Sequence, residues 1–238
     1  MSFLLPRWIA HRGGGTLAPE NTLAGIRLAA AMGFRAVEFD VMLSAEGTPV
    51  LIHDETLERT TNGSGLVCET DDRTLFSLDA GNGEAIPHFI EAARVCRTLG
   101  LLANVEIKPA VGHERATAEK VARLAAEIWY DAPDRVLISS FAPEAVEIAR
   151  DLAPALPRSL LFEVVPDDWV ECFARMRATA LHCDAACLSD DVLRQAAARN
   201  VPVVCYTVND PLAAQNLLDR GVSAFFTDRL DLFADQAG

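Results

Sequence analysis

The architecture of this chain can be worked out from residues 36–52, which read AVEFDVMLSAEGTPVLI. Two aliphatic runs, Ala36–Val41 and Thr48–Ile52, predict strands, and only Ser44-Ala45-Glu46-Gly47 provides a turn between them. A crossover between parallel strands takes about a dozen residues or more. The second run therefore predicts a strand that turns back as a hairpin, outside the set of parallel strands.

Around this hairpin, short aliphatic runs alternate with stretches of helical periodicity, which is typical of βα units. The expected parallel strands are Trp8–Ala10, Ala36–Val41, Leu101–Ile107, Val136–Ser139, Ser159–Phe162, Asp184–Leu188, Pro202–Thr207 and Ser223–Thr227. Pro87 near the first turn and Gly100 just past the end mark a helix over Ile86–Leu99, and Asp210-Pro211 and Gly221 bracket another. Eight such units predict an α/β fold, a (β/α)8 TIM barrel, although an open doubly wound sheet shows the same local pattern.

The chain shows no linker or internal repeat, so residues 1–238 are expected to form a single domain. Residues 54–85 differ from the rest because they are rich in Thr, Asp, Asn and Gly and show no helical period. Such a segment is expected to form a small insertion over the C-terminal mouth of the barrel, where lids and binding loops lie.

Composition narrows the classes of partner. The chain has 21 Lys plus Arg against 34 Asp plus Glu, a net charge of −13, which argues against nucleic-acid binding.

The six cysteines form no CxxC motif and are expected to be reduced. The start, MSFLLPRWIAHRGGG, lacks the basic region of a signal peptide, and no stretch reaches the roughly 18 apolar residues of a membrane helix. We expect a cytoplasmic protein without stable membrane association; its oligomeric state is undetermined, and a homodimer is compatible with the sequence.

Acidic side chains stand at the ends of two predicted strands, where barrel enzymes have their active sites. Glu38 and Asp40 share one face of their strand, because side chains alternate with a period of two, and Glu106 ends the next barrel strand. Three converging carboxylates would repel one another unless a cation neutralised them, and an all-oxygen set suits Mg²⁺ or Ca²⁺.

Two histidines are expected on the same rim. His11 ends the first strand and His53 ends the hairpin strand, so they could act as general acid and general base. Arg12 and Lys108 stand beside these groups. Each residue alone also fits a loop, a cap or a solvated surface, and it is their combination that indicates a site. Three further histidines are expected in helices or loops, in structural or solvent-facing positions: His88, His113 and His182.

An ordered set of short motifs then suggests a family. The motifs are His11-Arg12-Gly13, Pro19-Glu20-Asn21-Thr22, Glu38-Phe39-Asp40, Gly47-Thr48-Pro49-Val50 through His53-Asp54, Glu106-Ile107-Lys108, Tyr206-Thr207-Val208-Asn209 and Phe226-Thr227-Asp228. In this order and spacing the chain resembles the glycerophosphodiester phosphodiesterase family, of the cytosolic bacterial type. Any one fragment is common, but the ordered set spans nearly the whole chain.

The resemblance implies a TIM barrel that hydrolyses small-molecule glycerophosphodiesters to sn-glycerol 3-phosphate and an alcohol, with one divalent ion, Mg²⁺ or Ca²⁺. The implied roles are metal ligands for Glu38, Asp40 and Glu106, an acid and base pair for His11 and His53, and phosphate contacts for Arg12 and Lys108. Tyr206 stands where the family often has Trp, which suggests substrate binding with a different preference. Residues 54–85 fall where the family inserts a small subdomain.

Two other functions remain open at this level. One is a related barrel phosphodiesterase that cleaves lysophospholipids or another phosphodiester. The other is a barrel that binds a phosphorylated ligand without turnover, which is disfavoured because every acid, base and ligand position is filled. The sequence leaves open the alcohol headgroup, the metal, and which histidine is acid and which is base.

Overall fold

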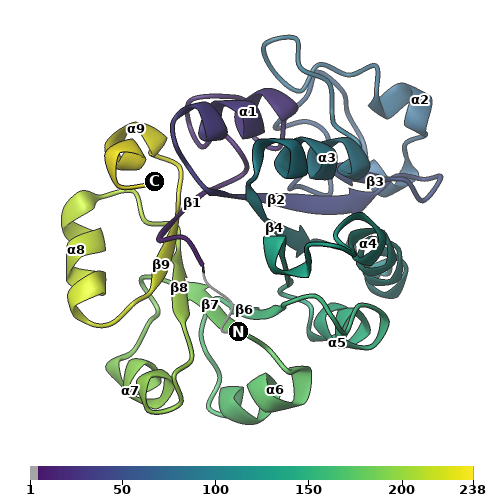
Figure 1. The fold of residues 1–238 in the computed structure, drawn as a ribbon. Helices are drawn as coiled ribbons and strands as arrows, with labels where there is room; N and C mark the ends of the chain where they lie inside the picture. Colours follow the sequence, from purple (N-terminus) through teal and green to yellow (C-terminus); the bar gives the residue numbers. More distant parts are fainter. Residues whose placement is uncertain (1–4, 238) are drawn as a thin grey trace.

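The computed structural model describes residues 5–237 and shows a nearly closed barrel of parallel strands (Figure 1). The barrel strands are β1 (Trp8–Ala10), β2 (Ala36–Leu43), β4 (Leu102–Ile107), β5 (Val136–Ser139), β6 (Ser159–Phe162), β7 (Ala180–Asp184), β8 (Val203–Tyr206) and β9 (Ala224–Thr227). Their order is β5-β4-β2-β1-β9-β8-β7-β6. The seam between β5 and β6 is closed by the Ile138–Arg158 bridge and by the Ile138 N–H, which donates to the Pro157 carbonyl. The predicted (β/α)8 barrel is confirmed.

Helices surround the barrel as an outer ring (Figure 1). They are α1 (Leu23–Ala31), α3 (Phe89–Leu99), α4 (Glu114–Ile128), α5 (Pro143–Leu152), α6 (Trp169–Met176), α7 (Asp190–Ala198), α8 (Pro211–Asp219) and α9 (Leu230–Phe233). Apolar side chains fill both the layer between strands and helices, where Phe39 and Trp129 are buried, and the barrel interior, where Ile9 and Leu102 belong to a second buried cluster. Together these two layers form the apolar core of the fold.

The predicted hairpin is present. Strand β3 (Pro49–Leu51) pairs antiparallel with the far end of β2, with Val41 opposite Leu51 and Leu43 opposite Pro49. Strand β2 runs two residues further than expected, because this extension has a partner of its own. The hairpin carries His53 back to the end of the barrel where the strands finish.

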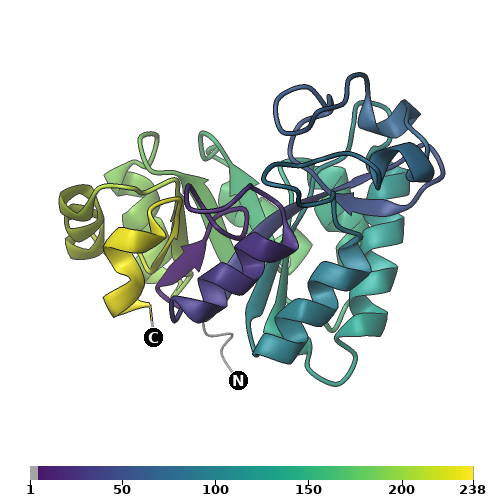
Figure 2. The same ribbon diagram turned by 90° about the horizontal axis from the view of Figure 1, so that it is seen from above.

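Residues 54–85 pack on this hairpin and rise beside the same end of the barrel (Figure 2). Their apolar side chains, including Leu57, Val67 and Leu75, form a separate small core with Met42 and Ile52. Although no helical period was expected, the segment contains a 3-10 turn (Val67–Glu69) and the short helix α2 (Asp72–Leu75), which Asp71 caps by accepting from the Thr74 N–H.

Two predicted elements were wrong in position. Strand β7 is Ala180–Asp184, whereas Asp184–Leu188 was expected; the inward histidine of the true strand disguised its aliphatic pattern, and residues after Asp184 form a turn before α7. Helix α3 begins at Phe89 rather than Ile86, because the carbonyl of Pro87 accepts from the Leu51 N–H and holds this residue beside the hairpin.

His182 lies on β7, not in a helix or loop, and it is fully buried. His88 and His113 occupy the N-cap positions of α3 and α4. All six cysteines are unpaired, as expected. Among residues 5–237, no helix combines the length and the apolar character needed to cross a membrane. The first four residues of the segment considered for a signal peptide lie outside the described residues.

The buried His182 predicts a pH dependence of stability. Burial lowers its pKa from 6.5 to about 3, so the unfolded chain takes up a proton below pH 6.5 that the folded chain refuses. Above pH 6.5 this residue therefore leaves the free energy of unfolding unchanged. Below pH 6.5 it lowers the free energy of unfolding as the pH falls, by about 2 kcal/mol at pH 5. In urea unfolding of metal-free protein at pH 7 and pH 5, His182→Gln should lose this part of the decline. Equal declines in the two proteins would contradict the assignment.

Candidate active site

One cavity of about 420 Å³ opens at the end of the barrel where the strands finish. The eight residues expected from sequence all line it: His11, Arg12, Glu38, Asp40, His53, Glu106, Lys108 and Tyr206. They come from β2, β4 and β8 and from the loops that follow β1, β3 and β4. The tertiary structure thus brings every predicted site residue to one place.

Three buried carboxylates lie close together in this cavity. Glu38, Asp40 and Glu106 each offer an oxygen, and these oxygens lie within 4.8 Å of one another. Burial, reinforced by the neighbouring carboxylates, raises the pKa of Glu38 well above its usual value and that of Glu106 to about 7. Within residues 5–237, Glu38 Oε1 is buried without a hydrogen-bond partner. The triad therefore fits a small cation that binds oxygen and could hold a divalent metal.

Each histidine at the rim is held by a carboxylate that was not singled out from sequence. His11 Nδ1 lies 2.7 Å from Asp228 Oδ1, and His53 Nδ1 lies 2.6 Å from Asp54 Oδ1. Both aspartates sit in motifs that supported the family resemblance, so a signal was present but their pairing with the histidines was not visible. In this arrangement the Nδ1–H groups donate to the two aspartates, and Nε2 is the ring nitrogen that takes no part in these pairs.

The surroundings of the two histidine–aspartate pairs shift the pKa values of their members. Burial is the main cause that lowers the pKa of His53, and the charges of Lys108 and Arg12 lower it further. Burial opposes ionisation of Asp228, but its hydrogen bonds to His11 and Asn209 outweigh burial and lower its pKa. Asp228 is thus an anion that orients the His11 ring.

Arg12 and Lys108 place positive charge between the carboxylates and the histidines. The backbone N–H of Arg12, a residue with φ of 50°, donates to Glu38 Oε2 at 2.9 Å, and its side-chain Nε lies 3.7 Å from Asp40. Lys108 Nζ donates to His53 Nε2 at 2.7 Å and lies 3.5 Å from Glu106. Both cations therefore stand where a phosphate group would need its charge offset.

Residues 54–85 reach the site through Arg59, a contact that sequence reasoning missed. The guanidinium binds Glu20 at 2.7 and 2.8 Å and also Asp54, and its hydrogen bond lowers the pKa of Asp54. Glu20 in turn accepts from Arg12 at 3.0 Å. Arg59 thereby joins residues 54–85 to Glu20 in the loop after β1, and it also holds Asp54, the partner of His53.

Apolar and aromatic side chains also line the cavity. Phe141, Leu161 and Phe226 line it together with Tyr206. The Tyr206 hydroxyl donates to the Phe162 carbonyl at 3.0 Å, and its ring meets Phe141 edge-on with centroids 5.8 Å apart. The Tyr206 ring is thus fixed in place and offers a surface, not a reacting group.

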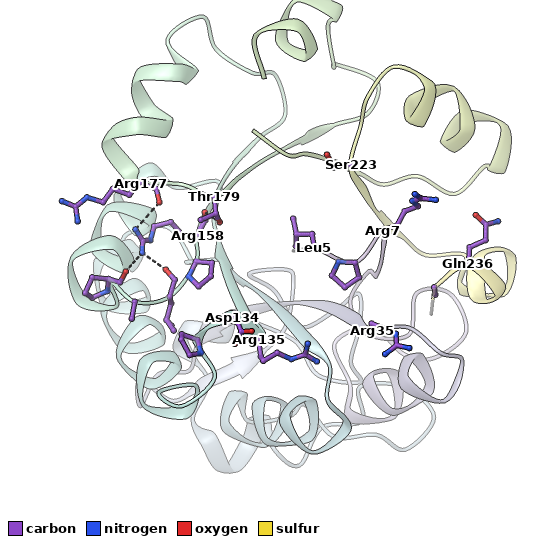
Figure 3. A pocket seen from close by; sticks show the side chains of 17 residues that line it. Leu5, Arg7, Arg35, Asp134, Arg135, Arg158, Arg177, Thr179, Ser223 and Gln236 are labelled. Carbon is purple, nitrogen blue, oxygen red and sulfur yellow. Dashed lines mark hydrogen bonds between the residues drawn. The ribbon is translucent and has the colours of Figure 1, made fainter. Parts of the chain in front are cut away.

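A larger hollow, of about 1360 Å³, opens at the other end of the barrel (Figure 3). Five arginines line it: Arg7, Arg35, Arg135, Arg158 and Arg177. The buried Arg158 donates to four backbone carbonyls, among them those of Met176 and Pro154 near helix ends, and Arg135 donates to the Gly100 carbonyl. Cations suit this end because helix C-termini carry partial negative charge, which accounts for the contacts of Arg135 and Arg158.

A barrel mouth that can hold a divalent cation beside an anion, with two oriented imidazoles, meets the requirements for hydrolysis of a phosphate ester. Comparison with known protein families identifies the class of hydrolase more narrowly. Residues 11–232 match the model of the glycerophosphoryl diester phosphodiesterase family, and the chain belongs to this family. It is therefore a phosphoric diester hydrolase.

Individual relatives are similar to this chain over most of its length. A glycerophosphodiester phosphodiesterase of Caldanaerobacter subterraneus subsp. tengcongensis is 32% identical over 228 residues, covering 92% of this chain and 93% of the relative. The structure of an Oleispira antarctica phosphodiesterase in complex with the product sn-glycerol-3-phosphate is 34% identical with a TM-score of 0.90, covering 97% and 96% of the two chains. A glycerophosphodiester phosphodiesterase of Agrobacterium tumefaciens is 26% identical with a TM-score of 0.81, covering 97% and 100%.

Proposed function

We propose that the chain hydrolyses glycerophosphodiesters to sn-glycerol 3-phosphate and an alcohol, with one Mg²⁺ or Ca²⁺ ion and with His11 and His53 as acid and base. One observation carries the proposal: two histidines, each held by a carboxylate, face a buried carboxylate triad within a single cavity. The product bound to the Oleispira antarctica relative supports the same substrate class.

Glu38, Asp40 and Glu106 would hold the metal, which when bound neutralises charge on the phosphate group. Arg12 and Lys108 bind the same anion from the histidine side and strengthen their hold as charge grows in the transition state. Asp228 and Asp54 keep the two imidazoles in the orientation that presents Nε2 to the cavity. One imidazole accepts the proton of the attacking oxygen while the other donates a proton to the leaving alkoxide, each contributing about 10² to 10⁴ in rate.

We further propose that residues 54–85 are a lid-like insertion within one domain spanning the chain. The bonds from Arg59 to Glu20 and Asp54 support this role, since they connect the insertion to both the loop after β1 and the partner of His53. We also propose that the protein acts in the cytoplasm. The six unpaired cysteines support this location, because free thiols persist in a reducing compartment.

The direct test measures release of glycerol 3-phosphate from glycerophosphocholine and glycerophosphoethanolamine with Mg²⁺, with Ca²⁺ and with EDTA. We expect turnover with at least one metal and its loss in EDTA. Absence of turnover on both diesters with either metal would contradict the proposed function.

Lys108→Ala is expected to raise KM for the diester by about tenfold, because an exposed charge pair with phosphate is worth on the order of 1 kcal/mol. The same variant removes a cation that donates to His53 Nε2, so the pKa of His53 should rise when followed by NMR. Lys120→Ala, on the surface of α4, serves as the control. Unaltered KM, kcat and His53 titration would show that Lys108 is only a solvated side chain.

A further inference from the structure

The candidate active site has two halves of different charge. In the order of strands around the barrel, β7 and β8 lie across from β2 and β4, which carry the carboxylate triad. Four of the basic side chains that line the cavity belong to the triad side: His11, Arg12, His53 and Lys108. The fifth, His182 on β7, is neutral at ordinary pH because burial lowers its pKa to about 3. Among the described residues that line the cavity, those on β7 and β8 therefore offer no positive charge to an incoming ligand.

That side holds a carboxylate that stands outside every ion pair of the described residues. Asp184 ends β7, lines the cavity and is half-buried. Its Oδ1 accepts from the Ala186 N–H at 2.7 Å, and within residues 5–237 it forms no ion pair. Glu163, in the loop after β6, adds a second negative charge nearby, and with burial and Asp184 it raises the pKa of the Tyr206 hydroxyl.

Aromatic rings complete this end of the cavity. Tyr206 is the register partner of Asp184 on the neighbouring strand, so ring and carboxylate stand side by side. Phe141 meets Tyr206 edge-on, remains 46% exposed, and has Lys108 Nζ 5.9 Å from its centroid. The ring of Phe141 thus borders both the phosphate-binding cation and the Asp184 end.

We propose that Asp184, Tyr206 and Phe141 form a subsite for a cationic alcohol group, so that the preferred substrates are glycerophosphodiesters whose alcohol carries an ammonium or quaternary ammonium. The inference rests on the proposed function and names its substrate class. A ring face attracts such a cation, and an uncompensated carboxylate adds charge attraction. The phosphate would lie against Arg12 and Lys108, and an ammonium two carbons beyond the ester oxygen would reach toward β7 and β8. A neutral alcohol gains neither attraction.

Binding and turnover measured side by side test the subsite. Calorimetry in a His53→Ala background with Mg²⁺ compares glycerophosphocholine with the neutral-headgroup diester glycerophosphoglycerol, and is repeated with Asp184→Asn added. Asparagine keeps the acceptor for the Ala186 N–H, so the change removes charge with little effect on the loop. Asp167→Asn is the matched control, because this exposed acid in the loop after β6 makes no side-chain hydrogen bond or ion pair within residues 5–237.

We expect the choline diester to bind about tenfold more tightly than the glycerol diester, and Asp184→Asn but not Asp167→Asn to remove that preference. In an otherwise wild-type background, kcat/KM should show the same loss of preference, mainly through KM. Equal binding of the two diesters, or an unchanged preference in Asp184→Asn, would overturn the subsite. A preference in binding without any turnover by the wild-type chain would support the subsite and count against the proposed function alone. Binding of neither diester would overturn both.

Discussion

His53→Ala is expected to lower kcat by about 10² to 10⁴ while the fold stays intact. The ring is only partly buried and makes polar contacts to Asp54 and Lys108 at the rim, so its removal leaves the apolar core of the barrel unchanged. The measurement is single-turnover and steady-state release of glycerol 3-phosphate, with circular dichroism to confirm the fold. His11→Ala should show a loss of similar size.

The same pair of variants can assign the roles that sequence left open. In a diester of p-nitrophenol, the leaving group departs as p-nitrophenolate and needs no proton. With this substrate the variant that lacks the acid should recover most of its rate, and the variant that lacks the base should not. His113→Ala, at the exposed start of α4, is the control and should behave as wild type. Near-normal turnover of the natural diester in either His11→Ala or His53→Ala would remove that residue from the mechanism.

Asp40→Asn is expected to weaken divalent-metal binding by at least about tenfold and to lower kcat in parallel, because one anionic ligand becomes a neutral one. The stability of metal-free protein should be equal or higher, since Asp40 is one of the charges that raise the pKa of Glu38 and Glu106. Calorimetric titration with Mg²⁺ and Ca²⁺, together with thermal unfolding with metal and with EDTA, separates the two effects. Glu38→Gln should act in the same way.

Asp134→Asn provides a matched control, because this exposed acid lines the hollow at the opposite end of the barrel. It should leave both metal titration and turnover as in the wild type. If the metal titration of Asp40→Asn matched that of this control, the carboxylate triad would lose its assignment as a metal site.

Much of the architecture was predictable because it depends on local spacing. The turn at Ser44–Gly47 is too short for a crossover, so the hairpin could be recognised without any knowledge of distant residues. The site residues were also predictable, because parallel strands all end on the same side and polar residues at those ends must meet. Glu38, Asp40 and Glu106 converge for this reason, and β2 and β4 align Asp40 directly with Glu106.

The prediction from local spacing was wrong where a buried polar side chain stands in place of an aliphatic one. In β7, His182 interrupts the pattern, while the apolar residues just after Asp184 belong to a turn, and the predicted strand was displaced accordingly. The polar strand interior is tolerated because the cavity and Ser159 lie next to this ring.

Pairing between distant residues could be decided only by the closed barrel. His11 and Asp228 are 217 positions apart, and they meet because β1 pairs with β9 when the sheet closes on itself. Asp184 faces the carboxylate triad for the same reason, since strands far apart in the chain become opposite walls of one cavity. Periodicity and spacing act over a few residues and so establish the strands, the barrel and the residues at its mouth. Which carboxylate orients which histidine, and what lies across from the metal ligands, depends on closure, and closure is a property of the whole chain.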